Sequence, residues 1–129
     1  MSQGTQTSIV HSFSQADFDN FARLSGAGAP MHWDPGFSAG TRLGRPVAHG
    51  QLLCSVLRGL IDRVIPGGRL KEQSVAFPAP TFADESMRFI VTVKRRSQGE
   101  TEALFDFELE VRRVEDGVLT CHGHGKVVV

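Results

Sequence analysis

One apolar stripe limits what this chain can fold into more than any other feature. Between residues 51 and 65, apolar side chains recur at steps of three and four, the spacing of one face of an α-helix. These side chains are Leu52, Leu53, Val56, Leu57, Leu60, Ile61 and Val64. Arg58, Asp62 and Arg63 mark the opposite side, and a Pro-Gly-Gly run at residues 66–68 ends the pattern. A helix with so wide an apolar face needs a partner surface, so we predict a buried central helix over residues 51–65.

After this helix the apolar period changes to two, which is typical of strands with one buried face. Polar turn sequences lie at residues 97–100 and 115–117 and favour hairpins. The expected strands are residues 69–78, 87–94, 102–111 and 118–128. We therefore predict an α+β domain in which a meander of four antiparallel strands packs around the central helix.

A short amphipathic helix is expected near the start of the chain. Ser14 is a good N-cap, and Asp17 is placed to complete a capping box. Phe13 and Phe18 are spaced for a hydrophobic staple across this cap. The buried stripe is expected to include Phe18, Phe21, Ala22 and Leu24. Gly26 is the natural end of the helix.

Length and composition exclude several classes of protein. The 129 residues suit a single domain, residues 1–129, and 14 basic residues balance 14 acidic ones. Without a net positive charge or a long basic run, nucleic acid is a poor candidate partner. The sequence has no apolar run of the ~20 residues that span a bilayer, and residues 1–12 lack the pattern of a signal peptide, so we expect a cytoplasmic protein without a membrane association. Cys54 and Cys121 are not spaced as a metal or redox motif, and we expect two buried reduced thiols.

Residues 25–50 form the segment with the most functional interest. Six glycines and three prolines make long regular elements unfavourable there. The segment nevertheless contains several apolar residues, namely Met31, Trp33, Phe37, Leu43 and Val47. A long loop inside a small domain is usually functional or disordered, and these apolar residues favour an ordered, functional loop. Within it, Asp34 and Pro35 are placed to cap and begin one short helical turn.

Two motifs in this segment carry a resemblance to a known family. The first comprises the run FARLSG from Phe21 and the Pro-x-His-x-Asp-Pro of residues 30–35, and the second is Pro46-Val47-Ala48-His49-Gly50 before the central helix. The chain thereby resembles the MaoC-like, (R)-specific enoyl-CoA hydratases, and the order of elements is similar along essentially its whole length. The resemblance implies a hot-dog fold, an antiparallel sheet wrapped around a long central helix. It also implies a homodimer, or a heterodimer, whose sheets join edge to edge.

The resemblance further implies an acyl-thioester site. In the family an Asp and a His form the catalytic pair, and the His corresponds to His32. The Asp position is Ala27 and the motif's Asn position is Ala29, neither of which can take a proton. The amide of Gly50, at the start of the central helix, is expected to face the thioester carbonyl. The residues expected to bind substrate are Ala27, Met31, Trp33, His49 and Arg58. Arg58 stands where the family tends to place a small polar residue.

The residues leave alternatives open at each of these positions. His32 is either a lone acid/base or a histidine retained for structure, and Gly50 is either an oxyanion donor or a tight turn. Asp34 is a possible substitute acid, although capping is the favoured interpretation. His122 and His124 share one face of a strand, but two imidazoles without a third ligand are a weak metal signal, and no metal is expected. Arg42, Arg45 and Arg58 either contact phosphates or are simply solvated.

Three functions remain as hypotheses. The first is a MaoC-like lyase that hydrates or dehydrates an acyl-CoA or acyl-carrier-protein substrate, or runs a related proton transfer, with an altered active site. It requires no cofactor, because coenzyme A or phosphopantetheine is part of the substrate. The second is a non-catalytic hot-dog subunit that binds acyl chains or supports a catalytic partner. The third is an acyl-CoA thioesterase, which is disfavoured because residues 51–61 contain no carboxylate.

Overall fold

A computed structural model describes residues 4–129 of the chain. Its regular elements are β1 (Gln6–His11), α1 (Gln15–Ser25), a 3₁₀ turn η1 (Pro30–His32), α2 (Pro35–Ala39), α3 (Gly50–Val64), β2 (Arg69–Ala76), β3 (Met87–Gln98), β4 (Ala103–Arg113) and β5 (Leu119–Val128). The five strands form one antiparallel sheet in the order β1-β3-β4-β5-β2. The predicted α+β class and the predicted central helix are therefore confirmed.

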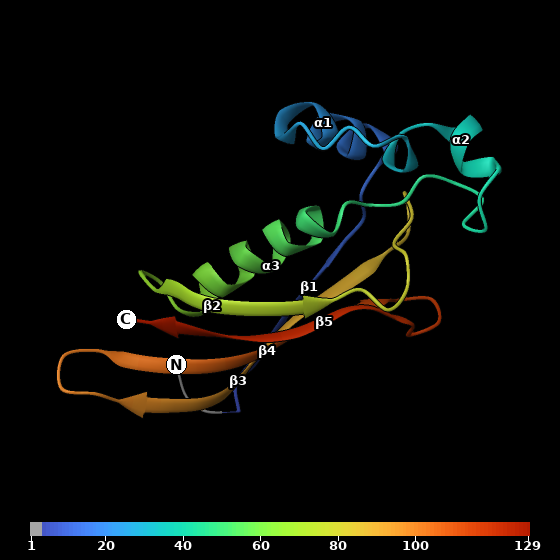
Figure 1. Cartoon of the computed structure of the whole chain (residues 1–129). Coiled ribbons are helices and arrows are strands. Elements are labelled where there is room, and N and C mark those ends of the chain that lie inside the picture. Colours follow the sequence, from blue (N-terminus) through green and yellow to red (C-terminus); the bar gives the residue numbers. More distant parts are fainter. Residues whose placement is uncertain (1–3) are drawn as a thin grey trace.

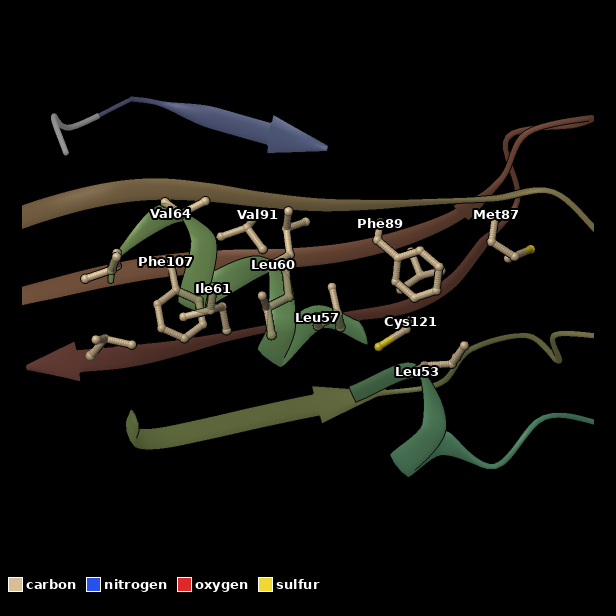
Figure 2. Close-up of a cluster of buried hydrophobic side chains, with 14 of the residues drawn as sticks. Leu53, Leu57, Leu60, Ile61, Val64, Met87, Phe89, Val91, Phe107 and Cys121 are labelled. Atoms are coloured by element: carbon tan, nitrogen blue, oxygen red, sulfur yellow. The ribbon is translucent and has the colours of Figure 1, made fainter. Parts of the chain in front are cut away.

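Helix α3 lies across one face of this sheet, while α1 and α2 lie beyond the N-terminal end of α3 (Figure 1). The apolar stripe of α3 faces the alternating apolar side chains of β3 and β4 (Figure 2). Leu57 of α3, Phe89 of β3 and Phe107 of β4 have no more than 1% of their surface exposed. Burial of side chains of this size contributes roughly 1.5–3 kcal/mol each, so this layer is the main source of stability.

Two features of the sheet differ from the sequence prediction. Strand β1 was not expected, because its burial alternates only weakly and it lies at an edge of the sheet. Its order comes from backbone pairing with β3 in the register Gln6↔Thr92 to His11↔Met87. The predicted four-strand meander is also wrong in part, since β2 pairs with β5 and not with β3. Only β3, β4 and β5 form a meander.

Helix α1 begins as the sequence predicts. The Ser14 side chain accepts from the Asp17 amide at 3.1 Å, and the Asp17 carboxylate accepts from the Ser14 amide at 2.8 Å. The staple rings of Phe13 and Phe18 have centroids 6.2 Å apart and are both buried. Leu24, expected in the buried stripe, is 85% exposed, so that prediction is wrong. It lies in the last turn before Gly26, after the helix has passed the core.

Both cysteines are free and buried, as expected. Burial raises the pKa of the Cys121 thiol to about 12, and the nearby Cys54 acts in the same direction. Both thiols are therefore held in their neutral, unreactive form. No helix in the described part of the chain is both long and apolar enough to cross a bilayer.

Candidate active site

His32 is held by backbone bonds between the two motifs of the central loop. The Val47 amide donates to the Met31 carbonyl at 3.0 Å, and the Val47 carbonyl lies 2.9 Å from His32 Nδ1. A carbonyl can only accept, so Nδ1 carries the proton and Nε2 of the neutral ring keeps its lone pair. The Gln15 side chain donates to the His32 carbonyl at 3.0 Å and ties the turn to α1. The result is an imidazole with a fixed orientation and a nitrogen available as a base.

His49 stacks directly on this imidazole. The two ring centroids are 3.7 Å apart with an interplanar angle of 20°, and Phe21 contacts His49 edge-on with centroids 4.8 Å apart. Nε2 of His49 donates to the Ala27 carbonyl at 2.8 Å. Nδ1 is therefore the unprotonated nitrogen, and within residues 4–129 it is buried without a hydrogen-bond partner. His49 thus connects His32 to the backbone at Ala27.

Burial lowers the pKa of His49 below its ordinary value, and the nearby His32 lowers it further. The hydrogen bond to the Ala27 carbonyl opposes these effects without cancelling them. The lowered pKa favours the neutral form of the His49 ring.

Helix α3 begins at Gly50 without a side-chain cap, because His49 is turned toward Ala27. The first amides of a helix have no acceptor within the helix, and they carry the positive end of its dipole. The ring of Phe77 lies over Gly50, so that a Cβ added there would come within 2.6 Å of the ring. A side chain at residue 50 would therefore require the Phe77 ring to move from its present contact with Gly50.

A pocket of about 510 Å³ opens beside His32 and the N-terminus of α3. This volume is within the range of small-molecule sites. Its lining residues are Met31, His32, Arg42, Leu43, Val47, Ala48, Gly50, Gln51, Leu53, Phe77, Pro78, Ala79, Pro80, Thr81 and Thr120. The wall is mainly apolar, and among these lining residues within 4–129 there is no carboxylate.

The structure brings together only some of the residues that the sequence predicts for the site. His32, Met31 and Gly50 line the pocket, and His49 supports it by the stacking described above. Trp33 does not line this pocket. Its indole donates to the Gly28 carbonyl at 2.9 Å, and the side chain lines a separate hollow near α1. Ala27 reaches the site through its carbonyl only.

Arg58, which the sequence predicts to bind substrate, also lies outside the lining of this pocket. Its guanidinium is 3.4 Å from the Asp62 carboxylate and 3.5 Å from the Gly68 carbonyl. This pairing lies toward the C-terminal end of α3, about two turns from Gly50. Asp62, the one acidic residue of α3, is therefore engaged in this pair.

Two further predictions concern residues outside the pocket. Asp34 caps α2, where its carboxylate accepts from the Gly36 amide at 2.9 Å, so the capping interpretation is confirmed. His122 and His124 lie on the outer face of β5, opposite Glu110 and Glu108 of β4. Within residues 4–129 no three His, Cys, Asp or Glu side chains are placed to hold a metal ion.

Sequence reasoning missed the segment that follows β2, which forms one wall of the pocket. The Thr81 carbonyl accepts from the Ala48 amide at 2.8 Å, and a β-bridge joins Phe82 to Val47. These bonds hold residues 77–81 against the start of α3. The alternating prolines Pro78 and Pro80 were the available signal, because proline interrupts a strand and rigidifies an extended segment.

Comparison with known proteins agrees with this arrangement. The family model described as MaoC like domain matches residues 2–113, which is most of the chain. The chain belongs to this family. A curated relative, the (R)-specific enoyl-CoA hydratase of Aeromonas caviae, is 36% identical over 92 residues, covering 70% of this chain and 69% of that protein.

Solved structures of MaoC-like proteins show the same hot-dog fold. The (R)-hydratase from A. caviae involved in PHA biosynthesis superposes with a TM-score of 0.89 at 29% identity, over 98% of this chain and 96% of that chain. The HadBC complex, a 3R-hydroxyacyl-ACP dehydratase from Mycobacterium tuberculosis, gives a TM-score of 0.80 at 14% identity, over 98% of this chain and 96% of that chain. At that identity the second likeness concerns the fold alone.

Proposed function

We propose that this MaoC-like chain is a lyase that acts on an acyl thioester, with His32 as its acid/base group. The observation that carries the proposal is the fixed tautomer of His32, whose Nδ1 is bonded to the Val47 carbonyl at 2.9 Å. This leaves an unprotonated Nε2 on a side chain that lines an apolar pocket. The relative from A. caviae is an (R)-specific enoyl-CoA hydratase.

The proposed reaction is the addition of water across the double bond of a 2-enoyl thioester. Nε2 of His32 takes a proton from water while the oxygen bonds to C3 of the acyl chain. The resulting imidazolium returns that proton to C2, so that one water is added and His32 is regenerated. The α3 amides at Gly50 and Gln51 stabilise the charge that develops on the thioester oxygen. Dehydration is the same sequence in reverse.

The composition of the pocket supports a second candidate, a non-catalytic subunit that binds acyl chains or supports a catalytic partner. The motif of the family has a carboxylate where this chain has Ala27, and no carboxylate lines the pocket within residues 4–129. A single histidine must then perform both proton transfers. The two candidates share one binding site and differ only in turnover.

The deciding experiment is the loss of enoyl absorbance when the protein meets trans-2-butenoyl-CoA. A His32→Asn variant is the sharpest test, because an asparagine amide can still donate to the Val47 carbonyl but offers no base. We expect kcat/KM to fall by about 10²–10⁴-fold, the usual contribution of general acid–base catalysis. A His122→Asn change on the outer face of the sheet is the matched control and should have no effect. Turnover that survives His32→Asn refutes the proposed role.

An Ala27→Asp variant separates the two candidates. The Ala27 carbonyl is held by His49, whose ring stacks on His32, so an aspartate at residue 27 is introduced on a backbone position that is tied to the site. An inactive wild type with an active Ala27→Asp variant would mean an intact pocket that has given up hydration, and would favour the binding subunit. Activity in both proteins would support the lyase with His32 acting alone.

We also propose that the chain works as a dimer, with itself or with a related chain. Strands β1 and β2 are the two edges of the sheet, and such edges offer unpaired backbone groups to a second sheet. Phe37 and Phe77, near the site, are 49% and 44% exposed. Light scattering after gel filtration tests this directly, and a monomer at all working concentrations would contradict it.

A further inference from the structure

The sequence suggests three arginines for phosphate contacts, Arg42, Arg45 and Arg58, and within residues 4–129 only Arg42 among these three has no hydrogen bond or ion pair. Arg45 stacks its guanidinium 4.1 Å from the centroid of the Phe82 ring and lies 3.7 Å from the Glu85 carboxylate. Arg58 is paired with Asp62, as described above. Arg42 lines the pocket and is exposed, and no hydrogen bond or ion pair engages it within residues 4–129.

The charges around the pocket favour an anionic ligand. Arg42 is the one lining side chain in the described part of the chain that carries a full charge at neutral pH irrespective of its surroundings. No lining carboxylate neutralises it. The uncapped N-terminus of α3 adds a partial positive charge to the same pocket. A ligand that enters this pocket therefore gains by carrying negative charge near Arg42.

The position of Arg42 indicates which part of a thioester it would meet. Thr81, Thr120 and Leu53 form the deep wall of the pocket and are almost fully buried. Arg42 lies on the exposed loop between α2 and α3, at the mouth. An acyl thioester that places its carbonyl at Gly50 and its acyl chain inward directs its carrier outward past this mouth. Both coenzyme A and acyl-carrier proteins bear a phosphate ester at the end of the pantetheine arm.

We propose that Arg42 binds a phosphate group of the phosphopantetheine-type carrier at the mouth of this pocket. The inference rests on the proposed function for the kind of ligand, but not for any chemical step. A guanidinium suits this role because its planar donors match two phosphate oxygens at once. Arg42 then selects the carrier, while His32 and the α3 amides act on the acyl group.

The test measures binding and not turnover, with butyryl-CoA as the probe because a saturated acyl group has no double bond to hydrate. Calorimetry compares wild type, Arg42→Gln and Arg42→Glu at low ionic strength. Arg63→Gln is the matched control, since Arg63 is an exposed arginine in the last turn of α3 and does not line the pocket. We expect Kd to rise about tenfold in Arg42→Gln and further in Arg42→Glu, with no change in Arg63→Gln. Added salt should reduce the difference between wild type and Arg42→Gln.

Two further probes identify the group that is bound. The butyryl thioester of N-acetylcysteamine has no phosphate, and its affinity should be the same for wild type and Arg42→Gln. Butyryl-4′-phosphopantetheine retains only the phosphate at the end of the arm. If Arg42→Gln weakens the binding of butyryl-4′-phosphopantetheine as much as that of butyryl-CoA, Arg42 binds the phosphate at the end of the arm. If Arg42→Gln weakens the binding of butyryl-CoA alone, Arg42 binds a phosphate of the nucleotide.

Clear outcomes would overturn the inference. An equal loss of affinity for the phosphate-free thioester would mean that Arg42 acts on the acyl group or shapes the pocket. An unchanged Kd for butyryl-CoA in Arg42→Glu, or no binding of either phosphate-bearing probe by wild type, would also refute it. Failure of the proposed catalytic role can be distinguished from failure of this inference. A wild-type protein that binds butyryl-CoA through Arg42 but hydrates no enoyl thioester would refute the lyase activity and leave the phosphate site supported.

Discussion

Replacing His49 with phenylalanine should stabilise the protein or leave its stability unchanged at neutral pH, although it removes a buried hydrogen bond. His49 is 4% exposed, and its Nδ1 has no partner within residues 4–129. Loss of the bond to the Ala27 carbonyl costs about 0.5–1.5 kcal/mol, and Ala27 is exposed enough for water to replace it. Removal of the unpaired buried nitrogen recovers about 1–3 kcal/mol. The net expectation is a gain of roughly 0–2 kcal/mol.

The same substitution should flatten the dependence of stability on pH. In the unfolded chain His49 takes up a proton near its ordinary pKa of 6.5, whereas burial and His32 lower the pKa in the folded protein. As the pH falls below that ordinary value, the unfolded state binds more protons than the folded state, so the wild type loses stability. The loss stops growing below the folded-state pKa. Phenylalanine has no proton to bind, and this contribution disappears.

Urea unfolding at about pH 7.5 and about pH 5.5 measures both effects in one series. Wild type should lose more stability between the two pH values than His49→Phe does. His124→Gln, on the exposed outer face of β5, is the control and should behave as wild type. A His49→Phe protein with the same pH dependence as wild type, or one destabilised by more than about 2 kcal/mol at the higher pH, would refute the reasoning.

Three other substitutions test the site, the core and a helix cap. Gly50→Ala places a Cβ 2.6 Å from the Phe77 ring, so kcat/KM or ligand affinity should fall at least about tenfold. Adding Phe77→Ala to the same chain should restore part of the lost activity or affinity. A Gly50→Ala protein that behaves as wild type would contradict the close approach. Leu57→Ala, at a side chain 0% exposed, should cost about 2–5 kcal/mol in urea unfolding, and a cost below about 1 kcal/mol would mean that α3 is not the core. Ser14→Ala should cost about 0.5–2 kcal/mol by the same measurement, and no change would mean that the capping box contributes nothing.

The elements that depend on local patterns were predictable from the sequence. The stripe of α3 and the alternation along β3 and β4 appear in the structure with the expected faces buried. The capping box at Ser14 and the cap at Asp34 were also predictable, because each depends on residues two or three positions apart. The free buried thiols followed from composition and spacing.

The elements that depend on distant partners were not predictable from the sequence. Strand β1 has little apolar character of its own and is ordered by pairing with β3, about 80 residues further along the chain. Strand β2 crosses to the far edge of the sheet beside β5, which no feature of its own sequence specifies. Leu24 has helical spacing but lies where α1 no longer meets the core, and its exposure is decided by that packing.

The features of the site likewise divide into those that the sequence predicts and those that only the folded chain shows. By itself the sequence determined that His32, His49 and Gly50 belong to two motifs around the start of a buried helix. Only the tertiary structure decided that the two imidazoles stack and that the segment after β2 closes the pocket. It also decided that Arg45 and Arg58 are paired while Arg42 has no partner among the described residues, 4–129. The physical reason is range: capping and amphipathic burial act over a few residues along the chain, whereas stacking, ion pairing and pocket formation depend on which distant segments the folded backbone brings into contact.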